Sequence, residues 1–312
     1  MLVLVDAGRV PSGSGRASAV VMNRRVVVAL VVLLLAVVTT QPADAKDTMT
    51  IRLPKGECRA VYDVVLHLHG HDPLVLDGIE AAGIDAAVIV VNRGLSSADY
   101  QRGFATTAML DSMLRLVRKR DRERGCDGRM GRLALSVWSA GYGGALELLA
   151  DAPGRFDAFV AMDAPYASYV GRRGSPISPP TLGPFLAYAR RAVRGDALMA
   201  ISHSQIRAPS YPAARETTSA MLRALGVERR KDPLEVAARR TQPVLDAFGG
   251  PPPPLKRLSV AEAGGLWVAA CEGRDAAAHV AHLTHAPSLG WKRLVERWVA
   301  KDDAGRARTP RS

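Results

Sequence analysis

Short apolar runs alternate with amphipathic segments along most of the chain. The runs at residues 61–68 and 86–91 are rich in β-branched side chains and predict buried parallel strands. Residues 105–117 carry apolar side chains at helical spacing, and Gly125 ends the basic stretch that follows. Strands that alternate with helices predict an α/β fold with a mainly parallel sheet. Further apolar runs that predict strands lie at residues 133–138, 158–162, 197–201 and 266–270.

Two stretches interrupt this alternation. Residues 168–184 are rich in Gly, Pro and Ser, and residues 249–254 contain four consecutive prolines. Such compositions predict surface loops, and the first is long enough to overhang a site as a small lid. The sequence has no internal repeat.

The segment that begins at Met22 has the three parts of a secretory signal peptide: a basic start, the apolar run 26–38 and an Ala-x-Ala end. We expect cleavage after Ala45, by a Sec-type route. The run is shorter than the roughly 20 residues that a membrane-spanning helix needs; an uncleaved N-terminal anchor is the alternative. Residues 1–21 are interpreted as a mis-called or non-structural extension, and residues 46–312 as one α/β domain with a flexible basic C-terminal tail.

Composition and charge change this picture little. The chain of 312 residues has 42 Lys and Arg against 30 Asp and Glu, a net charge of +12, and it is 48% hydrophobic. This composition excludes disordered, collagen-like and disulfide-knot proteins. Many basic residues lie at 115–132, where interleaved acids and scarce aromatics favour a solvated helix face over a nucleic-acid site. We therefore expect no specific nucleic acid, and a loose association with anionic envelope polymers.

The three cysteines are Cys58, Cys126 and Cys271. An exported chain with three cysteines can close one disulfide and leave one thiol over. Cys58 can pair with Cys126, since each flanks the start of a predicted strand, but the sequence does not decide the pairing. Their spacing fits no metal site.

The most informative segment follows the predicted strand 133–138. Ser139 stands between that strand and a helix that ends near Ala150, a position that lifts a serine to the carboxyl edge of the sheet. Gly141 supplies the small residue that this turn needs, whereas Val137 stands where the pattern Gly-x-Ser-x-Gly has a glycine. The alternative is a phosphate-binding turn, but the P-loop ending and the dinucleotide spacing are both missing. Gly143 and Gly144 are expected to let the helix pack closely on the sheet.

At these residues the chain resembles the α/β-hydrolase family, over most of residues 57–300. The matching pieces are VVLHLHGH at 64–71, VWSAGYGG at 137–144 and a histidine-bearing segment after the last strand. The resemblance implies helices on both faces of the sheet, a small loop or helix lid, and a serine nucleophile. It also implies an oxyanion hole made by the backbone N–H groups of His71 and Ala140.

Histidines on the first strand have another interpretation. His67, His69 and His71 alternate along it, so a metal cluster or plain packing is conceivable. No fourth ligand is evident in the sequence, and we expect no metal.

The resemblance implies the chain order nucleophile, acid, histidine. His279 stands at the expected start of the final helix and is the first choice for the base; His282, one turn further on, is the second choice. His285 is expected to be a surface residue. The spacing of these histidines also suits a metal-binding face, but no carboxylate or Cys partner is evident beside it.

The acid candidate is Asp163, which directly follows the predicted strand 158–162. A carboxylate at the end of a strand can hold the imidazole in one tautomer and stabilise its protonated form. The commoner position in the family is one strand later, where this chain has Ser202, His203 and Ser204 instead. A capping or turn aspartate is the alternative for Asp163.

Together these residues predict an exported serine hydrolase that cleaves an ester or amide through an acyl-enzyme. The substrate is expected to be a small molecule or an acylated polymer, no cofactor is implied, and no stable membrane span remains after cleavage of the signal. Residues 166–184 and 203–215 are expected to wall the substrate pocket. A non-catalytic relative that binds a cell-envelope ligand is the alternative, kept open by Val137 and by the displaced acid.

Overall fold

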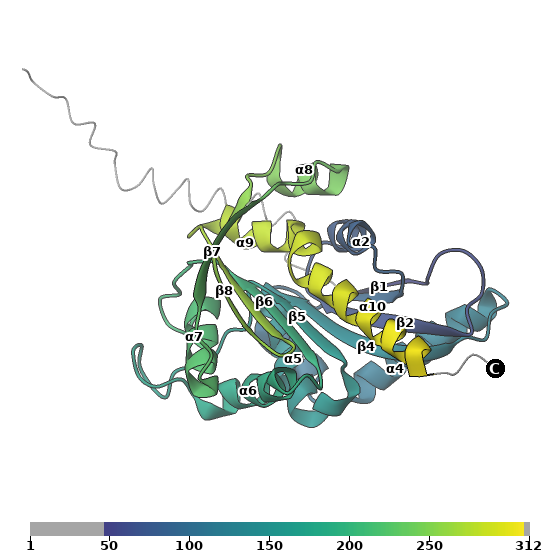
Figure 1. The fold of residues 1–312 in the computed structure, drawn as a ribbon, viewed down its shortest axis with the longest axis horizontal. Helices are drawn as coiled ribbons and strands as arrows, with labels where there is room; N and C mark the ends of the chain where they lie inside the picture. Colours follow the sequence, from purple (N-terminus) through teal and green to yellow (C-terminus); the bar gives the residue numbers. More distant parts are fainter. Residues whose placement is uncertain (1–46, 309–312) are drawn as a thin grey trace, which may run out of the picture. The chain divides into compact units, whose positions relative to one another are not determined.

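The computed structural model describes residues 47–308, and within them nine strands form one sheet (Figure 1). The strands that lie from β3 to β9 across the sheet are parallel to one another. At one edge β1 pairs antiparallel with β3, and at the other β8 and β7 form an antiparallel extension. In order across the sheet the strands are β1 (Thr48–Arg52), β3 (Ala87–Asn92), β2 (Val61–Leu68), β4 (Arg129–Trp138), β5 (Ala158–Met162), β6 (Leu198–His203), β9 (Leu266–Cys271), β8 (Leu255–Ala263) and β7 (Arg230–Val236).

Every apolar run expected to be a strand forms one, because central strands of a parallel sheet are buried on both faces and are apolar throughout. The three antiparallel strands were not predicted. β7 is mostly exposed and contains a proline, as an edge strand can, so its sequence lacks the apolar signal.

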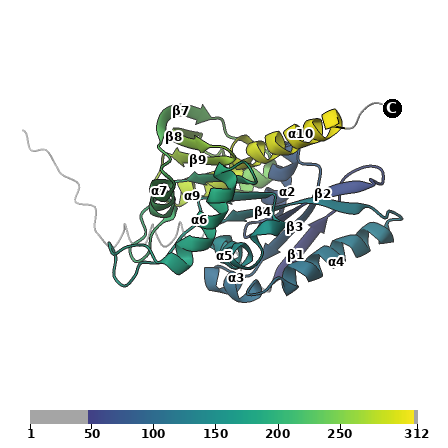
Figure 2. The same ribbon diagram turned by 60° about the horizontal axis from the view of Figure 1, so that its bottom comes forward.

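Helices cover both faces of the sheet, and the predicted fold class is confirmed (Figures 1 and 2). The first face carries α3 (Ser97–Gly103), α4 (Ala108–Glu123), α5 (Tyr142–Asp151), α6 (Pro179–Val193) and α7 (Ala214–Leu225). The second carries α2 (Asp72–Ala81), α8 (Gln242–Phe248), α9 (Ala276–Thr284) and α10 (Gly290–Arg308).

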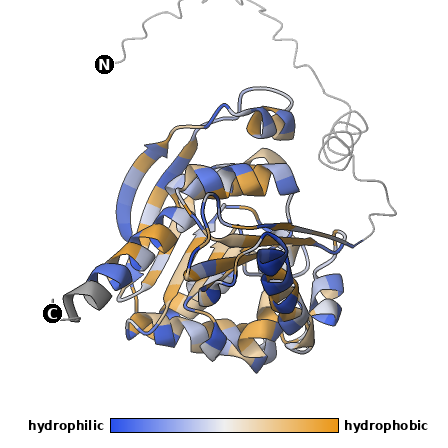
Figure 3. Ribbon diagram, turned by 90° about the vertical axis from the view of Figure 1, so that its right-hand side faces the viewer, coloured by the Kyte–Doolittle hydropathy of each residue, from blue (hydrophilic) through white to orange (hydrophobic). Residues whose placement is uncertain are grey.

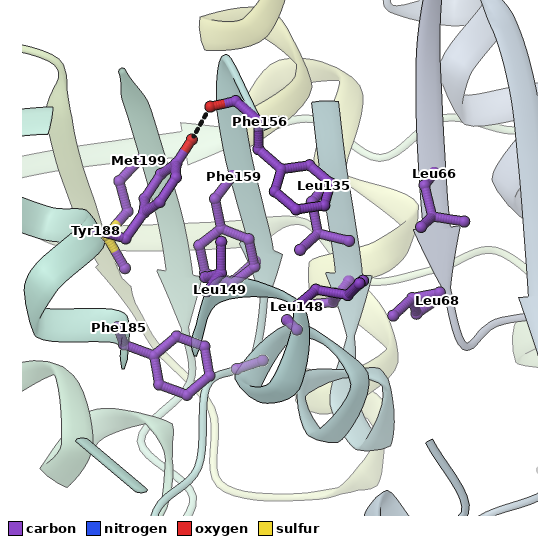
Figure 4. Close-up of a cluster of buried hydrophobic side chains, with 14 of the residues drawn as sticks. Leu66, Leu68, Leu135, Leu148, Leu149, Phe156, Phe159, Phe185, Tyr188 and Met199 are labelled. Carbon is purple, nitrogen blue, oxygen red and sulfur yellow. Dashed lines mark hydrogen bonds between the residues drawn. The ribbon is translucent and has the colours of Figure 1, made fainter. Parts of the chain in front are cut away.

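Two apolar clusters fill the space between the sheet and these two layers. In the cluster under α5 and α6, Leu66, Leu135 and Phe159 from the strands meet Leu148 and Phe185 from the helices (Figure 4). Apolar residues dominate the central strands, whereas the helices alternate between polar and apolar positions (Figure 3). The core therefore holds the carboxyl ends of the parallel strands in fixed positions.

Of the two expected surface loops, one is confirmed and the other is only partly correct. Residues 249–254 connect α8 to β8 without regular structure, as predicted. The expectation for residues 168–184 is wrong at its end, since α6 begins at Pro179 and contains Pro184. Proline is well tolerated in the first turn of a helix, where its missing N–H has no partner to lose. The loop that remains closes on itself through a β-bridge between Tyr169 and Ile177.

A disulfide joins Cys58 to Cys126, and Cys271 is a buried free thiol. The expected extension at residues 1–21, the signal peptide at 22–45 and the last residues of the C-terminal tail lie outside the described part of the chain. Among the helices of the described part, none combines the length and the apolar character needed to cross a membrane.

Candidate functional site

Three parallel strands end in residues whose backbone is strained. His69 follows β2 with φ 72°, Ser139 follows β4 with φ 47°, and Asp163 follows β5 with φ 44°. Within residues 47–308 no other residue except glycine has a positive φ. Such conformations cost about 1–3 kcal/mol each and tend to persist where the chemistry of a site requires them. The strain therefore marks the carboxyl edge of the sheet as the place to look for a site.

Ser139 opens a tight 3-10 turn, Ser139–Gly141, between β4 and α5. A side chain at Gly141 is excluded, because its Cβ would lie 2.1 Å from the carbonyl oxygen of Leu68 at the end of β2. The glycine predicted to be needed after Ser139 thus allows the turn to touch the neighbouring strand. Val137 is fully buried in the apolar core, so a valine is accommodated before the serine.

The glycines further into the helix serve different contacts. A Cβ on Gly144 would meet the Leu68 side chain at 2.7 Å, as expected for close packing on the sheet. Gly143 instead faces the first turn of α3, where a Cβ would lie 2.1 Å from the carbonyl oxygen of Ser97. The prediction that both glycines pack on the sheet is therefore wrong for Gly143.

Asp163 and His279 form a buried hydrogen-bonded pair. The Nδ1 of His279 lies 2.6 Å from the Oδ2 of Asp163, whose side chain is only 2% exposed. Ser204, one strand later, donates its backbone N–H at 2.8 Å and its hydroxyl at 3.1 Å to the same carboxylate. Burial by itself raises the pKa of Asp163, but the hydrogen bond from His279, nearby histidine charge and the Ser204 N–H outweigh it and hold that pKa well below its usual range.

His279 is positioned by contacts on both its helix and its ring. It lies in the first half of α9, where Asp275 caps the helix by accepting a hydrogen bond from the N–H of Ala278 at 2.9 Å. Trp138 donates its indole N–H to the His279 carbonyl at 3.1 Å, and their rings are 4.8 Å apart. The expectation that His279 begins the final helix is wrong, because α10 follows α9.

Within the described residues, no hydrogen bond joins Ser139 to His279 or Asp163. The residue before Ser139, Trp138, makes the ring contact with His279. Tyr166 lies near Ser139, and its pKa is raised well above its ordinary value, chiefly by burial. Tyr166 belongs to an aromatic group with Tyr142 and Tyr211, at ring distances of 5.2 and 5.6 Å.

The candidate oxyanion donors are the backbone N–H groups of Ala140, in the turn after β4, and of His71, at the start of α2. Ala140 is buried in the turn after Ser139, and His71 is the exposed N-cap residue of α2. The N–H groups before His71 are used, since that of His69 donates to Val91 and that of Gly70 to the side chain of Asn92. No hydrogen bond in the described part of the chain occupies the N–H of His71 or of Ala140, so both are free to bind an oxygen.

The second-choice base and its neighbour are both buried. His282 has its Nδ1 2.9 Å from the Ser202 hydroxyl, and burial lowers its pKa to about 4. It makes no hydrogen bond with Asp163. His285, expected on the surface, is only 2% exposed and contacts the Ala281 carbonyl through Nδ1 at 2.9 Å. That expectation is wrong because α9 packs against α2 and α8 on the sheet rather than facing solvent.

The histidines of β2 are buried and hydrogen-bonded to protein groups. His67 lies 3.0 Å from the Ser136 hydroxyl and 2.8 Å from the His69 carbonyl, and burial lowers its pKa to about 4. The Nδ1 of His69 lies 2.9 Å from the Tyr100 hydroxyl, and its ring stacks on Trp138. Within residues 47–308, no group of His, Cys, Asp or Glu side chains is arranged to hold a metal ion.

The roles of three residues of the site were not predicted from the sequence. Trp138 ends β4 next to the candidate nucleophile, and this aromatic side chain was a usable signal. Tyr166 was expected only in the wall of the pocket. Ser204 was noted only as a pocket residue, because its double hydrogen bond to Asp163 depends on the pairing of β5 with β6.

No protein-family model matches the sequence, and no curated protein matches it either. Similar solved structures include an IroE-like serine hydrolase from Shewanella oneidensis, 16% identical with a TM-score of 0.42 over 80% of this chain and 75% of that one. The siderophore hydrolase EstB from Aspergillus nidulans is 17% identical, with a TM-score of 0.40 over 81% of this chain and 89% of that one. A thermostable esterase is 12% identical, with a TM-score of 0.40 over 82% of this chain and 58% of that one. These values are too low for the activities in the names to be carried to this chain.

Proposed function

We propose that the chain is an exported serine hydrolase that cleaves an ester or amide through an acyl-enzyme. Ser139 is the nucleophile, His279 the general base and Asp163 the residue that orients the base. The observation that carries the proposal is the buried Asp163–His279 pair beside a strained serine. A nucleophile and an orienting acid at the ends of the adjacent strands β4 and β5, with a base on α9, form the constellation that acyl transfer needs.

The acid–base pair supports this assignment through its tautomer. Because the pKa of Asp163 is held low, its carboxylate is ionised at neutral pH and accepts the Nδ1–H of His279. The remaining ring nitrogen of His279, Nε2, then carries a lone pair and can accept a proton. His282 has its Nδ1 on the Ser202 hydroxyl and not on Asp163, so the carboxylate does not orient its ring.

The proposed reaction has two halves. Nε2 of His279 takes the proton of the Ser139 hydroxyl as Oγ attacks the carbonyl carbon, and the N–H groups of His71 and Ala140 bind the resulting oxyanion. As the carbonyl re-forms, the bond to the leaving alcohol or amine breaks and the protonated His279 gives that group its proton. In the second half, water loses a proton to His279 and attacks the acyl carbon. The bond to Oγ then breaks, His279 returns the proton to Ser139, and the acid is released.

This reaction requires the Ser139 hydroxyl to come within hydrogen-bond reach of Nε2 of His279. Catalytic hydrogen bonds often form only when substrate binds, and a rotation about the side-chain bond of Ser139 changes the direction of its hydroxyl. Tyr166, near Ser139, is placed to contact the substrate in the proposed scheme.

Export is proposed on the sequence of residues 22–45 and on the Cys58–Cys126 disulfide. Disulfides persist in secreted and periplasmic proteins and are rare in the reducing cytosol, so the cross-link supports a Sec-dependent route. The net charge of +12 supports loose attraction to anionic envelope polymers.

A second candidate is a non-catalytic relative that binds a cell-envelope ligand. One observation favours it, since among the described residues no hydrogen bond joins Ser139 to His279, whose Nδ1 is bonded to Asp163. In this case the carboxyl edge would bind a ligand without cleaving it, and Ser139 would not react.

Turnover of short p-nitrophenyl esters by the purified mature chain separates the two. We expect hydrolysis by the wild type and a loss of about 10³-fold or more in kcat for Ser139→Ala. The matched control is Ser112→Ala, the same change on the exposed surface of α4, which should keep the wild-type rate. A wild type that hydrolyses no acyl substrate, or a Ser139→Ala variant with full activity, would overturn the catalytic proposal.

A further inference from the structure

A cavity of about 630 Å³ lies at the carboxyl side of the sheet, between the loop after β5 and the helix α7. Its walls include Tyr169 and residues 174–177 on one side, and Arg207, Arg215 and Arg223 on the other. The two walls come from the segments expected to enclose the substrate pocket, with α7 extending the second wall.

The three arginines of this cavity have no acid to pair with. Within the described residues, the side chains of Arg207, Arg215 and Arg223 form no ion pair and no hydrogen bond. The one carboxylate in the lining, Glu216, already accepts the Tyr169 hydroxyl at 3.1 Å and the Ala213 N–H at 3.3 Å. The lining therefore carries an excess of positive charge.

A fourth arginine behind the wall adds to this excess. Arg229 donates to Nε2 of His203 at 2.8 Å, while its Nη1 is buried and without a hydrogen-bond partner in the described part. Burial, and then the positive charge of Arg215, lower the pKa of Arg229. The positive charges of Arg215 and Arg229 therefore repel each other, and an anion bound beside Arg215 would offset this repulsion.

One loop links the cavity to the neighbourhood of the candidate nucleophile. Tyr166, which lies near Ser139, packs against Tyr211, and the N–H of Ala167 donates to the Pro212 carbonyl at 3.4 Å. Tyr169 in the cavity wall is three residues further along the same loop. The loop after β5 therefore contributes both to the surroundings of Ser139 and to the wall of the cavity.

We propose that the cavity binds an anionic group of the substrate, a carboxylate or a phosphate-like group, so that the preferred substrates are anionic esters or amides. The anion lies a few bonds from the scissile carbonyl, where the Arg215 and Arg223 guanidinium groups bind it. Guanidinium groups suit this purpose because their donors match the two oxygens of a carboxylate or phosphate. This inference rests on the proposed function and names its substrate class.

The test compares p-nitrophenyl butyrate with the p-nitrophenyl monoesters of succinate, glutarate and adipate, and with a chain that ends in a phosphonate. At low salt we expect kcat/KM for the best anionic ester to exceed that of the neutral ester by about tenfold, as one charge-assisted contact allows. This ratio should shrink in 0.5 M NaCl, because salt screens exposed charges over about 4 Å at that concentration.

The arginine variants assign the preference to the cavity. Arg215→Gln and Arg223→Gln should each lower the ratio several-fold, and the double variant should bring it near one. The control is Arg118→Gln on the exposed face of α4, which removes the same charge far from the cavity and should leave the ratio unchanged.

The outcomes separate this inference from the proposed function. Hydrolysis of the neutral ester with no preference for either anionic arm overturns the inference and leaves the hydrolase proposal standing. An equal loss of preference in Arg118→Gln also overturns it, since general attraction by the net charge would then suffice. A wild type that cleaves none of the esters overturns the proposed function itself. Preference for the carboxylate or the phosphonate arm supports the inference and identifies the group.

Discussion

Two cavities of similar volume, about 630 Å³ each, lie at opposite ends of the parallel strands. They differ in whether the charged side chains of their linings form ion pairs. The cavity at the amino ends is lined by the starts of β2 and β4, and within the described residues all of its charged side chains except Arg129 form ion pairs. There Arg132 contacts Asp63 at 2.5 Å and Asp302 at 2.9 Å, and Arg59 pairs with Asp85. At the carboxyl ends, the arginines of the other cavity have no acidic partner.

The strained backbone follows the same division. His69, Ser139 and Asp163, with their positive φ angles, all stand at the carboxyl ends of strands. Proteins commonly give up stability at functional sites and recover it elsewhere. We infer that the side chains at the amino edge stabilise the fold. At the carboxyl edge, the strained residues and the arginines without ion pairs instead bind the substrate or act on it.

The largest expected effect comes from the acid of the carboxyl edge. Asp163→Asn keeps the shape of the side chain but reverses its hydrogen bond with Nδ1, which places the His279 proton on the wrong nitrogen. We expect kcat for a p-nitrophenyl ester to fall by about 10⁴-fold. Asp196→Asn, at an exposed site, is the control and should retain full activity. A fall in kcat of less than tenfold in Asp163→Asn would show that Asp163 is not the acid that orients His279.

Acid should destabilise the protein through the histidines near the carboxyl edge. Burial lowers the pKa of His67 and His282 to about 4 and of His69 and His203 to about 3. The unfolded chain, with histidine pKa values near 6.5, binds these protons first, so stability is full above about pH 6.5 and falls as the pH drops. Each histidine should cost about 2 kcal/mol between pH 7 and pH 5.

Urea unfolding at pH 7, 6 and 5 measures this loss. His282→Asn should lower by one the number of protons that the chain takes up on unfolding in acid. The contributions of the remaining histidines should be unchanged. An unfolding free energy that stays constant from pH 7 to pH 5 would show that these histidines are not buried in the neutral form.

At the amino edge, Arg132→Ala should act on stability alone. It removes the ion pair with Asp63 and the hydrogen bond to the Trp298 carbonyl, and leaves a half-buried carboxylate without its partner. We expect the unfolding free energy to fall by about 1–2 kcal/mol, with kcat/KM unchanged. A large loss of activity at unchanged stability would reverse the roles assigned to the two edges.

The smallest expected effect on stability is at the carboxyl edge. Arg215→Gln removes a charge that has no partner, so the unfolding free energy should change by less than about 0.5 kcal/mol. A gain in stability is consistent with relief of repulsion from Arg229. A loss as large as that of Arg132→Ala would mean that Arg215 is a structural residue.

Local signals in the sequence were sufficient for the central strands and for the turn at Ser139. Buried parallel strands are apolar throughout, and a serine followed by Gly141 between strand and helix is a short-range pattern. The edge strands escaped prediction because exposed, polar segments such as β7 pair only through the backbone.

The choice among the histidines depended on three-dimensional contacts. His279, His282 and His285 have similar spacing in the sequence, but α9 directs only His279 to Asp163. The unpaired arginines could not be predicted for the same reason, since Arg207 and Arg215 look like ordinary surface charges until their neighbours are known.

The most direct test of the central claim is covalent labelling of the mature wild-type chain with a fluorophosphonate, followed by peptide mass spectrometry. If Ser139 is the activated nucleophile, a single adduct should map to the tryptic peptide that contains it, and Asp163→Asn should slow its formation. Absence of labelling, or an adduct on another serine, would contradict the account.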